Sequence, residues 1–319
     1  MARSMDGVLS LYLGTKIAIF SPMKESVRVL MAGLIDYAGL FPPAGLPMNQ
    51  AVSNFERYRA GSEAWALGRF IVPASRLKEF EDAISSARDE AQKSAPLMLS
   101  ALLTSGDVSE INLLLDFNRR HAERTARIET VEVKATTTDE VRRIGRSAGG
   151  RFTVYCEFPI GDGLSDLISS AAEAGLRAKV RTGGVTPEVF PPTTDLVRFL
   201  YACSTKRLPF KATAGLHHAV RGSYRLTYER NSPSGTMSGF LNVFVAAALL
   251  VEGMDINDAV RVLEETDAGA FQFDESGVVW RSYRLPLDRL SLSRRGFAIA
   301  FGSCSFLEPI EEMRALNLL

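Results

Sequence analysis

Lysines and carboxylates occur inside short apolar segments of this sequence, where charged side chains are unexpected. Lys179, Lys211, Asp36 and Glu132 each stand in a segment that we predict to be a buried strand. An unpaired buried charge is costly, so these groups must either pair with one another or carry out chemistry. Ion pairing explains any one of them as well as a function does. The whole cluster favours an active site, because such sites concentrate perturbed charges.

Two neighbouring lysines without a metal suggest amine chemistry. A free lysine has a pKa of about 10.4 and is a poor nucleophile at neutral pH, but a second cation nearby lowers that pKa. At about 6 Å and an effective dielectric constant near ~20, the repulsion is about 2.8 kcal/mol, or roughly two pKa units. Lys179 and Lys211 could form such a pair. The neutral amine would attack a carbonyl to form a Schiff base, and a carboxylate such as Asp36 or Glu132 would move protons through water.

The segments that would position these groups alternate between strand-like and helix-like patterns, which is typical of βαβ units and a parallel sheet. Eight strands are predicted, at Gly33–Leu40, Arg69–Pro73, Leu97–Leu103, Thr130–Ala135, Phe152–Phe158, Arg177–Arg181, Pro209–Ala214 and Ala298–Ser303. In the α/β class, eight such units form a (β/α)8 or TIM barrel, whose catalytic groups gather at the carboxyl ends of the strands. We therefore expect a single TIM-barrel domain over residues 1–319.

Apolar residues recur with helical spacing between the predicted strands. Outer helices are predicted at Ser75–Ala91, Asp107–Arg124, Thr138–Ser147 and Leu164–Ala174. Residues 1–30 form an N-terminal extension. About 80 residues separate the seventh and eighth strands, about twice the length of a simple barrel unit. Residues 220–295 are therefore predicted to include an insertion of two helices and a hairpin-like piece around Ala270–Arg284.

The composition narrows the class of partner. The 319 residues carry 37 basic and 37 acidic side chains, so the sequence lacks the charge signature of nucleic-acid or membrane-surface binding and favours a small molecule. Three cysteines and three histidines without paired spacing predict no metal and no cofactor, and they fit a reducing, cytoplasmic setting. The apolar stretch Phe240–Val251 is well short of the roughly 20 residues that span a bilayer, and indicates a buried helix. A homo-oligomer is compatible with these features.

Short motifs follow one another in the order of the predicted strands. They are Leu34-Ile35-Asp36-Tyr37, Phe70-Ile71-Val72-Pro73, Val131-Glu132-Val133, Glu157, Lys179 to Gly183, Lys211 to Gly215 and Gly302 to Ser305. Each alone is common, but their order and strand placement resemble those of deoxyribose-phosphate aldolase and its class I aldolase relatives. The resemblance covers much of the chain. It implies a (β/α)8 barrel with lyase activity that cleaves or forms carbon–carbon bonds through a Schiff base, without a metal.

The resemblance also implies roles for particular residues. Lys179 would form the Schiff base, and Lys211 would lower its pKa. Asp36 and Glu132 would relay protons, and Glu157 corresponds to a glutamate on the fifth strand of the family. The substrate would be a small aldehyde, ketone or keto acid, with or without a phosphate group.

This sequence departs from the family pattern at several positions. Tyr37 replaces a histidine, and Glu132 replaces an aspartate. Lys134 is additional, and Arg181 is inserted in the lysine motif. These differences leave the predicted fold intact and put the family's particular substrate in doubt.

Residues at the same strand ends are candidates for binding the substrate. They are Lys134, Glu157, Arg181, Thr182, Gly183, Gly215, His217, Gly302, Ser303 and Ser305. The turn from Gly302 to Ser305 precedes an expected helix, so its backbone N–H groups could hold a phosphate or carboxylate; an ordinary capped turn is the alternative. Arg181 could bind such an anion, or pair with Glu132 or Glu157.

Other candidates are weaker. His217 and His218 could act as an acid and a base, but adjacent histidines point to opposite faces of an extended chain and no third metal ligand has suitable spacing. Cys304 has no histidine near it in the sequence, so we predict a structural role for it.

Two other functions fit the same residues. In the first, a non-covalent barrel enzyme, an isomerase or a phosphoribosyl-type transferase, uses the lysines and arginine to hold a polyanionic substrate. In the second, a barrel without catalytic activity binds a sugar or phosphate, since a fold does not imply a function. Borohydride trapping separates the Schiff-base enzyme from both, because only an iminium is reduced to a stable adduct.

Overall fold

The computed structural model describes residues 23–87, 95–121 and 125–319. Most of the predicted N-terminal extension, and the predicted ends of two helices at 88–91 and 122–124, lie outside the described residues.

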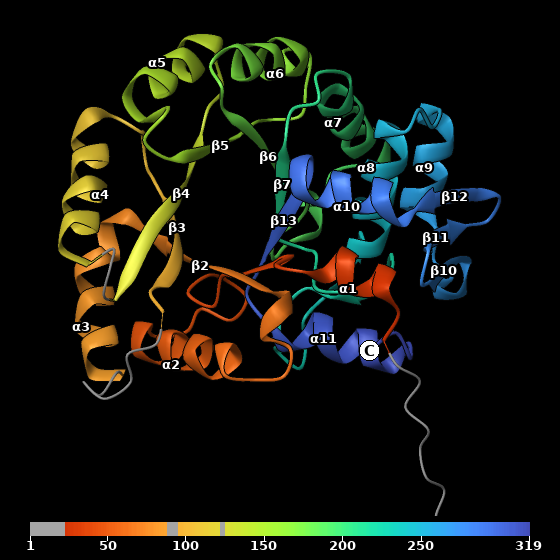
Figure 1. Ribbon diagram of the computed structural model, residues 1–319, viewed down its shortest axis with the longest axis horizontal. Coiled ribbons are helices and arrows are strands. Elements are labelled where there is room, and N and C mark those ends of the chain that lie inside the picture. Colours follow the sequence, from red (N-terminus) through yellow and green to blue (C-terminus); the bar gives the residue numbers. More distant parts are fainter. Residues whose placement is uncertain (1–22, 88–94, 122–124) are drawn as a thin grey trace, which may run out of the picture.

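Parallel strands form a closed barrel, as predicted from the sequence (Figure 1). The order around the barrel is β1-β13-β7-β6-β5-β4-β3-β2. The strands are β1 (Ile35–Tyr37), β2 (Leu67–Pro73), β3 (Leu97–Leu102), β4 (Ala126–Lys134), β5 (Thr153–Glu157), β6 (Arg177–Arg181), β7 (Phe210–Thr213) and β13 (Ala298–Ser303). Each of the eight predicted strands overlaps one of them, which confirms the TIM-barrel fold class.

The two lysines of β6 and β7 stand between fully buried apolar residues. In β6, Ala178 and Val180 are fully buried on either side of Lys179, and in β7, Phe210 and Ala212 flank Lys211 in the same way. Both faces of a barrel strand are covered, so apolar residues are needed at successive positions. Lys179 and Lys211 are directly paired in the register of β6 and β7, which places both lysines at the same level of the barrel.

Helices surround the barrel, with α3 and α4 on one side and α7, α8 and α9 on the other (Figure 1). The helices that follow barrel strands are α2 (Met48–Arg59), α3 (Leu77–Ala87), α4 (Val108–His121), α5 (Thr138–Ala148), α6 (Leu164–Glu173), α7 (Thr193–Thr205) and α11 (Leu307–Ala315). The four predicted amphipathic segments each overlap one of these helices. Thr137 starts α5 with a capping box, in which its hydroxyl accepts from the backbone N–H of Glu140. Short 3-10 helices occur at Ala64–Ala66, Ala74–Arg76, Pro187–Val189 and Ala268–Ala270.

The segment between β7 and β13 is richer in elements than we predicted. It contains a hairpin of β8 (Gly222–Arg225) and β9 (Ser234–Met237), helices α8 (Phe240–Val251), α9 (Ile256–Glu264) and α10 (Leu287–Gly296), and the strands β10 (Phe271–Asp274), β11 (Gly277–Trp280) and β12 (Tyr283–Pro286). The predicted hairpin is part of a three-stranded antiparallel sheet. The β8–β9 hairpin was missed because its polar strands lack an apolar face.

The predicted buried helix is α8, which packs against α7, α9, α10 and β13. It is apolar on all sides because neighbours cover all of them. At the amino end of the barrel, α1 (Glu25–Met31) lies against α10. Among the described residues, no helix has the length and apolar character needed to cross a membrane.

Candidate active site

Charged side chains from neighbouring strands form a continuous series of ion pairs inside the carboxyl end of the barrel. Lys211 Nζ lies 2.6 Å from Asp36 Oδ2 and 2.5 Å from Glu132 Oε1. The other oxygen of that glutamate, Oε2, lies 2.7 Å from Lys179 Nζ, which is also 2.8 Å from Glu157 Oε2. Glu132 therefore joins the two lysines. We call this series, together with Arg181, the ion-pair chain.

Arg181 forms the outer end of the ion-pair chain. Its Nε lies 3.2 Å from Glu157 Oε1, and nearly half of its side chain is exposed. Burial would raise the pKa of Glu157, but the charges of Lys179 and Arg181 outweigh burial and lower that pKa. Arg181 therefore pairs with Glu157, and anion binding by Arg181 stays a prediction.

Hydrogen bonds from neighbouring strands fix the buried carboxylates. The Ser100 hydroxyl donates to Glu132 Oε1 at 2.7 Å, and the backbone N–H of Arg69 donates to Asp36 Oδ1 at 2.6 Å. The ammonium of Lys211 also lies 5.6 Å from the centre of the Tyr155 ring, close enough for a cation–π interaction. Both Asp36 and Glu132 thus have partners at each oxygen.

The charges of the ion-pair chain determine its protonation. Burial would raise the pKa of Glu132, but the two lysines outweigh burial and hold that pKa far below its ordinary range. For Lys211, burial would lower the pKa, but Asp36 and Glu132 outweigh it and raise the pKa above its ordinary range. Lys211 is therefore a stable ammonium at neutral pH. Glu132 lies between the two lysines and offsets their mutual repulsion. The repulsion estimated from the sequence did not account for this carboxylate.

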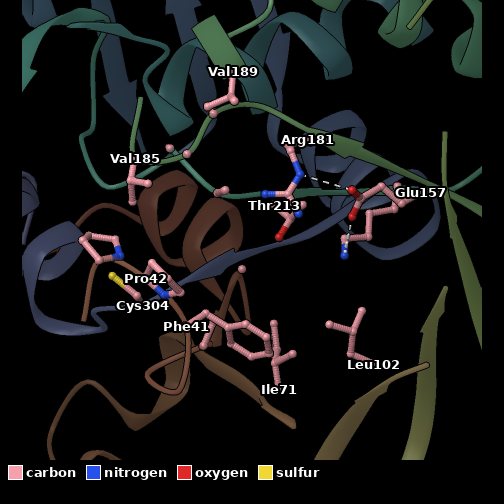
Figure 2. A pocket seen from close by; sticks show the side chains of 18 of the residues that line it. Phe41, Pro42, Ile71, Leu102, Glu157, Arg181, Val185, Val189, Thr213 and Cys304 are labelled. Atoms are coloured by element: carbon pink, nitrogen blue, oxygen red, sulfur yellow. Dashed lines mark hydrogen bonds and ion pairs between the residues drawn. The ribbon is translucent and has the colours of Figure 1, made fainter. Parts of the chain in front are cut away.

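A cavity of about 530 Å³ opens above the ion-pair chain. Figure 2 shows Glu157 and Arg181 on one side of it and the apolar side chains of Phe41, Ile71 and Leu102 on another. Lys179, Glu132, Glu157 and Arg181 line this cavity, whereas Lys211 and Asp36 do not and lie beneath its floor. Of the two buried lysines, Lys179 is thus the one that a ligand can reach.

The other predicted binding residues divide into two groups. Residues that line the cavity are Lys134, Gly183, Gly215, His217 and Gly302. Lys134 is exposed at the end of β4 and has no ion pair within the described part of the chain. It is a free cation at the cavity wall.

Thr182, Ser303 and Ser305 lie outside the cavity lining, and their hydroxyls hold the surrounding loops. Thr182 donates to the carbonyls of Thr213 and Ala214. In the predicted anion-binding turn, Ser303 Oγ accepts from the backbone N–H of Ser305.

A second serine hydroxyl of this turn also accepts from a backbone N–H group, at the start of α11. Ser305 Oγ accepts from the backbone N–H of Glu308 at 3.2 Å. The backbone N–H groups of Ser305 and Glu308 are therefore already hydrogen-bonded. Anion binding by this turn stays a prediction.

A histidine and a cysteine that the sequence argument separated meet at the cavity wall. His217 Nε2 lies 3.9 Å from Cys304 Sγ, and His217 Nδ1 lies 2.9 Å from Glu308 Oε2. Burial would lower the pKa of His217, but hydrogen bonds to Cys304 and Glu308 outweigh burial and raise it to about 10. The signal was available in the predicted topology: His217 follows the seventh strand and Cys304 the eighth, and neighbouring strands bring such residues together.

Within residues 23–87, 95–121 and 125–319, no group of three His, Cys, Asp or Glu side chains is arranged to hold a metal ion.

A scan against protein-family models and a search of curated proteins each found no match to this chain. The class that the fold and the site define is a TIM barrel with a buried lysine–carboxylate site at its carboxyl end. TIM barrels are commonly enzymes, and their active sites lie at this end.

Proposed function

We propose that this chain is an enzyme in which Lys179 forms a Schiff base with a small carbonyl substrate, and through it cleaves or forms a carbon–carbon bond, as class I aldolases do. One observation carries the proposal: a buried lysine, held between Glu132 and Glu157, opens into a cavity at the catalytic end of a barrel. A lysine so enclosed by acceptors has a route for its proton, which an amine nucleophile requires.

The first step requires a neutral amine. Lys179 transfers a proton to Glu132 or Glu157, both of which contact its Nζ. The amine nitrogen then bonds to the carbonyl carbon to give a carbinolamine. The protonated glutamate returns its proton to the hydroxyl, which leaves as water, and an iminium remains. The iminium carries the same positive charge as the original ammonium, so the net charge of the ion-pair chain is unchanged. Glu132 and Glu157, the two carboxylates that contact Lys179, stabilise the intermediate.

The second step uses the iminium as an electron sink. A carboxylate of the ion-pair chain removes the proton of the substrate's β-hydroxyl, and the adjacent carbon–carbon bond breaks. Its electron pair moves into the iminium to form an enamine, and an aldehyde is released. Protonation of the enamine carbon and hydrolysis return Lys179. Glu157 is suited to the proton transfer, because it lines the cavity beside Lys179.

Lys211 acts beneath the cavity in this proposal. Its ammonium binds one oxygen of Glu132, and Lys179 contacts the other. Lys211 therefore positions Glu132 and favours its ionised form, so that protonation of Glu132 is transient.

The substrate's anionic part, if it has one, would bind near Lys134 and Arg181. Both line the cavity, and Lys134 has no ion pair among the described residues. The turn at Ser303 and Ser305 contributes less to this proposal, because its hydroxyls and two of its N–H groups are occupied. A single carboxylate or phosphate on the substrate matches this supply of charge.

Borohydride trapping tests the proposal. The protein is incubated with glycolaldehyde, pyruvate, glyoxylate and a panel of sugar phosphates, reduced with sodium borohydride and mapped by mass spectrometry. We expect a stable adduct on Lys179. Lys179→Met should abolish that adduct and turnover of any substrate so identified. Lys206→Met, which removes an exposed lysine outside the cavity lining, should leave both in place.

Other results would contradict the Schiff-base role of Lys179. Adducts on surface lysines only, or turnover that survives Lys179→Met, would overturn the Schiff-base role. A ligand that raises the melting temperature without any adduct at Lys179 would instead support a non-covalent isomerase or transferase, or a barrel that only binds its ligand.

A further inference from the structure

Three side chains at the cavity wall are ordered as a nucleophile, a base and an orienting acid. Cys304 Sγ faces His217 Nε2 at 3.9 Å, and the opposite ring nitrogen, Nδ1, faces Glu308 Oε2 at 2.9 Å. They come from separate elements, since Cys304 follows β13, His217 follows β7 and Glu308 is in the first turn of α11. This is the arrangement by which proteins activate a thiol: the base takes its proton, and a carboxylate orients the base.

The cluster faces the same cavity as Lys179. Both Cys304 and His217 line that cavity, and Figure 2 shows Cys304 beside Pro42 at its wall. Cys304 is only 5% exposed, so the cavity is its access to a small reactant.

The groups around the sulfur suit a thiolate. Besides His217, the Tyr228 hydroxyl lies 3.5 Å from Cys304 Sγ, and Tyr37 of β1 contributes a phenol nearby. Burial raises the pKa of Tyr37 to about 12 and that of Tyr228 further, so both remain neutral phenols, and Tyr228 can donate to the sulfur. Glu308 pairs with His217 and also forms a hydrogen bond with the Tyr228 hydroxyl.

We propose that Cys304, His217 and Glu308 form a second reactive centre on this cavity, a nucleophilic thiol that adds reversibly to the carbonyl carbon of an aldehyde. In the reactive form the thiol proton is on His217, and the sulfur bonds to the carbonyl carbon. The carbonyl π pair moves to oxygen, which takes the proton back from His217 to give a neutral thiohemiacetal. No electron donor or acceptor is needed, because the addition is redox-neutral.

The two parts of this proposal depend on different observations. The reactivity of the thiol follows from the contacts of Cys304 alone. The choice of an aldehyde rests on the proposed function, because carbon–carbon cleavage through an iminium releases one into this cavity.

The pH dependence of alkylation by iodoacetamide tests the thiol. An ordinary thiol with a pKa of about 8.5 reacts roughly 100-fold faster at pH 8.5 than at pH 6, in proportion to its thiolate. For Cys304 we expect a change of less than about fivefold, because the proposed pairing of its sulfur with His217, 3.9 Å away, makes reaction less dependent on bulk pH. His217→Gln and Glu308→Gln should slow alkylation at pH 6 by about tenfold or more.

Controls are available within the chain. Cys156 and Cys203 are fully buried, burial raises the pKa of both thiols, and neither should react. His218 forms a similar ion pair with Glu312, which lies in α11 like Glu308. His218→Gln should therefore leave the rate at Cys304 unchanged. Resistance of Cys304 to iodoacetamide, a rate that follows the ordinary thiol profile, or an unchanged rate in both folded Glu308 and His217 variants would overturn the reactive thiol.

Protection by glycolaldehyde in Lys179→Met tests the ligand separately from the imine. We expect glycolaldehyde to slow alkylation of Cys304 at least threefold in this variant, with full recovery after dilution. Rapid alkylation that glycolaldehyde does not slow would overturn the aldehyde as its partner. This variant has no Schiff-base lysine, so protection of Cys304 in it does not depend on imine formation. Failure of the borohydride experiment and failure of the thiol proposal can therefore be told apart.

Discussion

Both ends of the barrel bury cations, and the partners of those cations differ in kind. At the amino end, Arg294 donates to the backbone carbonyls of Leu30 at 2.6 Å, Ala32 at 3.0 Å and Ile299 at 2.7 Å, and also to that of Ala298. Burial lowers the pKa of Arg294 to about 10, and it remains a cation at neutral pH. Backbone carbonyls do not exchange protons, so this cluster has only a structural role, joining the end of α1 to the start of β13.

At the carboxyl end, Lys179 and Lys211 are bound by carboxylates, which can accept a proton. Lys179 also reaches a cavity, whereas Arg294 is buried among backbone atoms. A buried cation therefore does not by itself indicate function. The partner's capacity to take a proton and the access of a ligand distinguish the two ends.

The largest effect on stability is expected from Lys211→Met. This change leaves the carboxylates of Asp36 and Glu132 buried without their shared cation, and breaking a buried ion pair costs about 3–5 kcal/mol of unfolding free energy. Guanidinium chloride unfolding measures the loss. Adding Asp36→Asn to Lys211→Met should recover part of it, and a loss below about 1 kcal/mol would show that these carboxylates do not depend on Lys211.

Arg294→Met should have the next largest effect, and only on stability. Loss of the guanidinium leaves buried carbonyl oxygens without a donor, which we expect to cost about 2–3 kcal/mol. Borohydride trapping per folded molecule should stay within about twofold of the unmodified protein, because a structural effect at a distant site is usually additive with changes elsewhere. A tenfold change in trapping would contradict the separation of the two ends.

Acid should lower the free energy of unfolding, because it protonates Glu132 more readily in the unfolded chain than in the folded protein. Its pKa in the folded protein is below the ordinary value of 4.5, so under more acid conditions the unfolded chain binds a proton that the folded chain does not. The contribution is present above about pH 4.5 and is lost as the pH falls, with a slope approaching about 1.4 kcal/mol per pH unit. The raised pKa of Lys211 has the opposite sign, so its contribution is lost only in strong alkali. Glu132→Gln should flatten the acid limb by that slope in urea unfolding between about pH 4.5 and 3, and parallel limbs would contradict this.

The smallest effect is expected from Ser100→Ala, which removes one hydrogen bond to Glu132 while leaving both lysines in place. We expect a loss of about 1 kcal/mol in the free energy of unfolding. Thr130→Val is the matched control, because the buried Thr130 hydroxyl has no hydrogen-bond partner among the described residues. Equal losses in the two variants would show that the hydrogen bond to Glu132 adds nothing.

The barrel strands could be predicted because their signals are local. A run such as Val131 to Val133, followed after a turn by a helical pattern, is visible within about 20 residues of sequence, and eight such units specify a barrel. The β8–β9 hairpin could not be predicted in this way. Its residues are mostly polar, so it has no apolar pattern of its own, and β9 packs against the short 3-10 helix Pro187–Val189.

The sequence by itself determined which residues are chemically unusual: charged groups in strands that otherwise require apolar side chains. Only the tertiary structure decided their partners. Closing the barrel brings Lys211 to Asp36, which is 175 residues away in the chain, and brings Cys304 to His217, which is 87 residues away. Ion pairs and proton transfer depend on distances of a few ångströms in space, and sequence separation does not set those distances until the chain has folded.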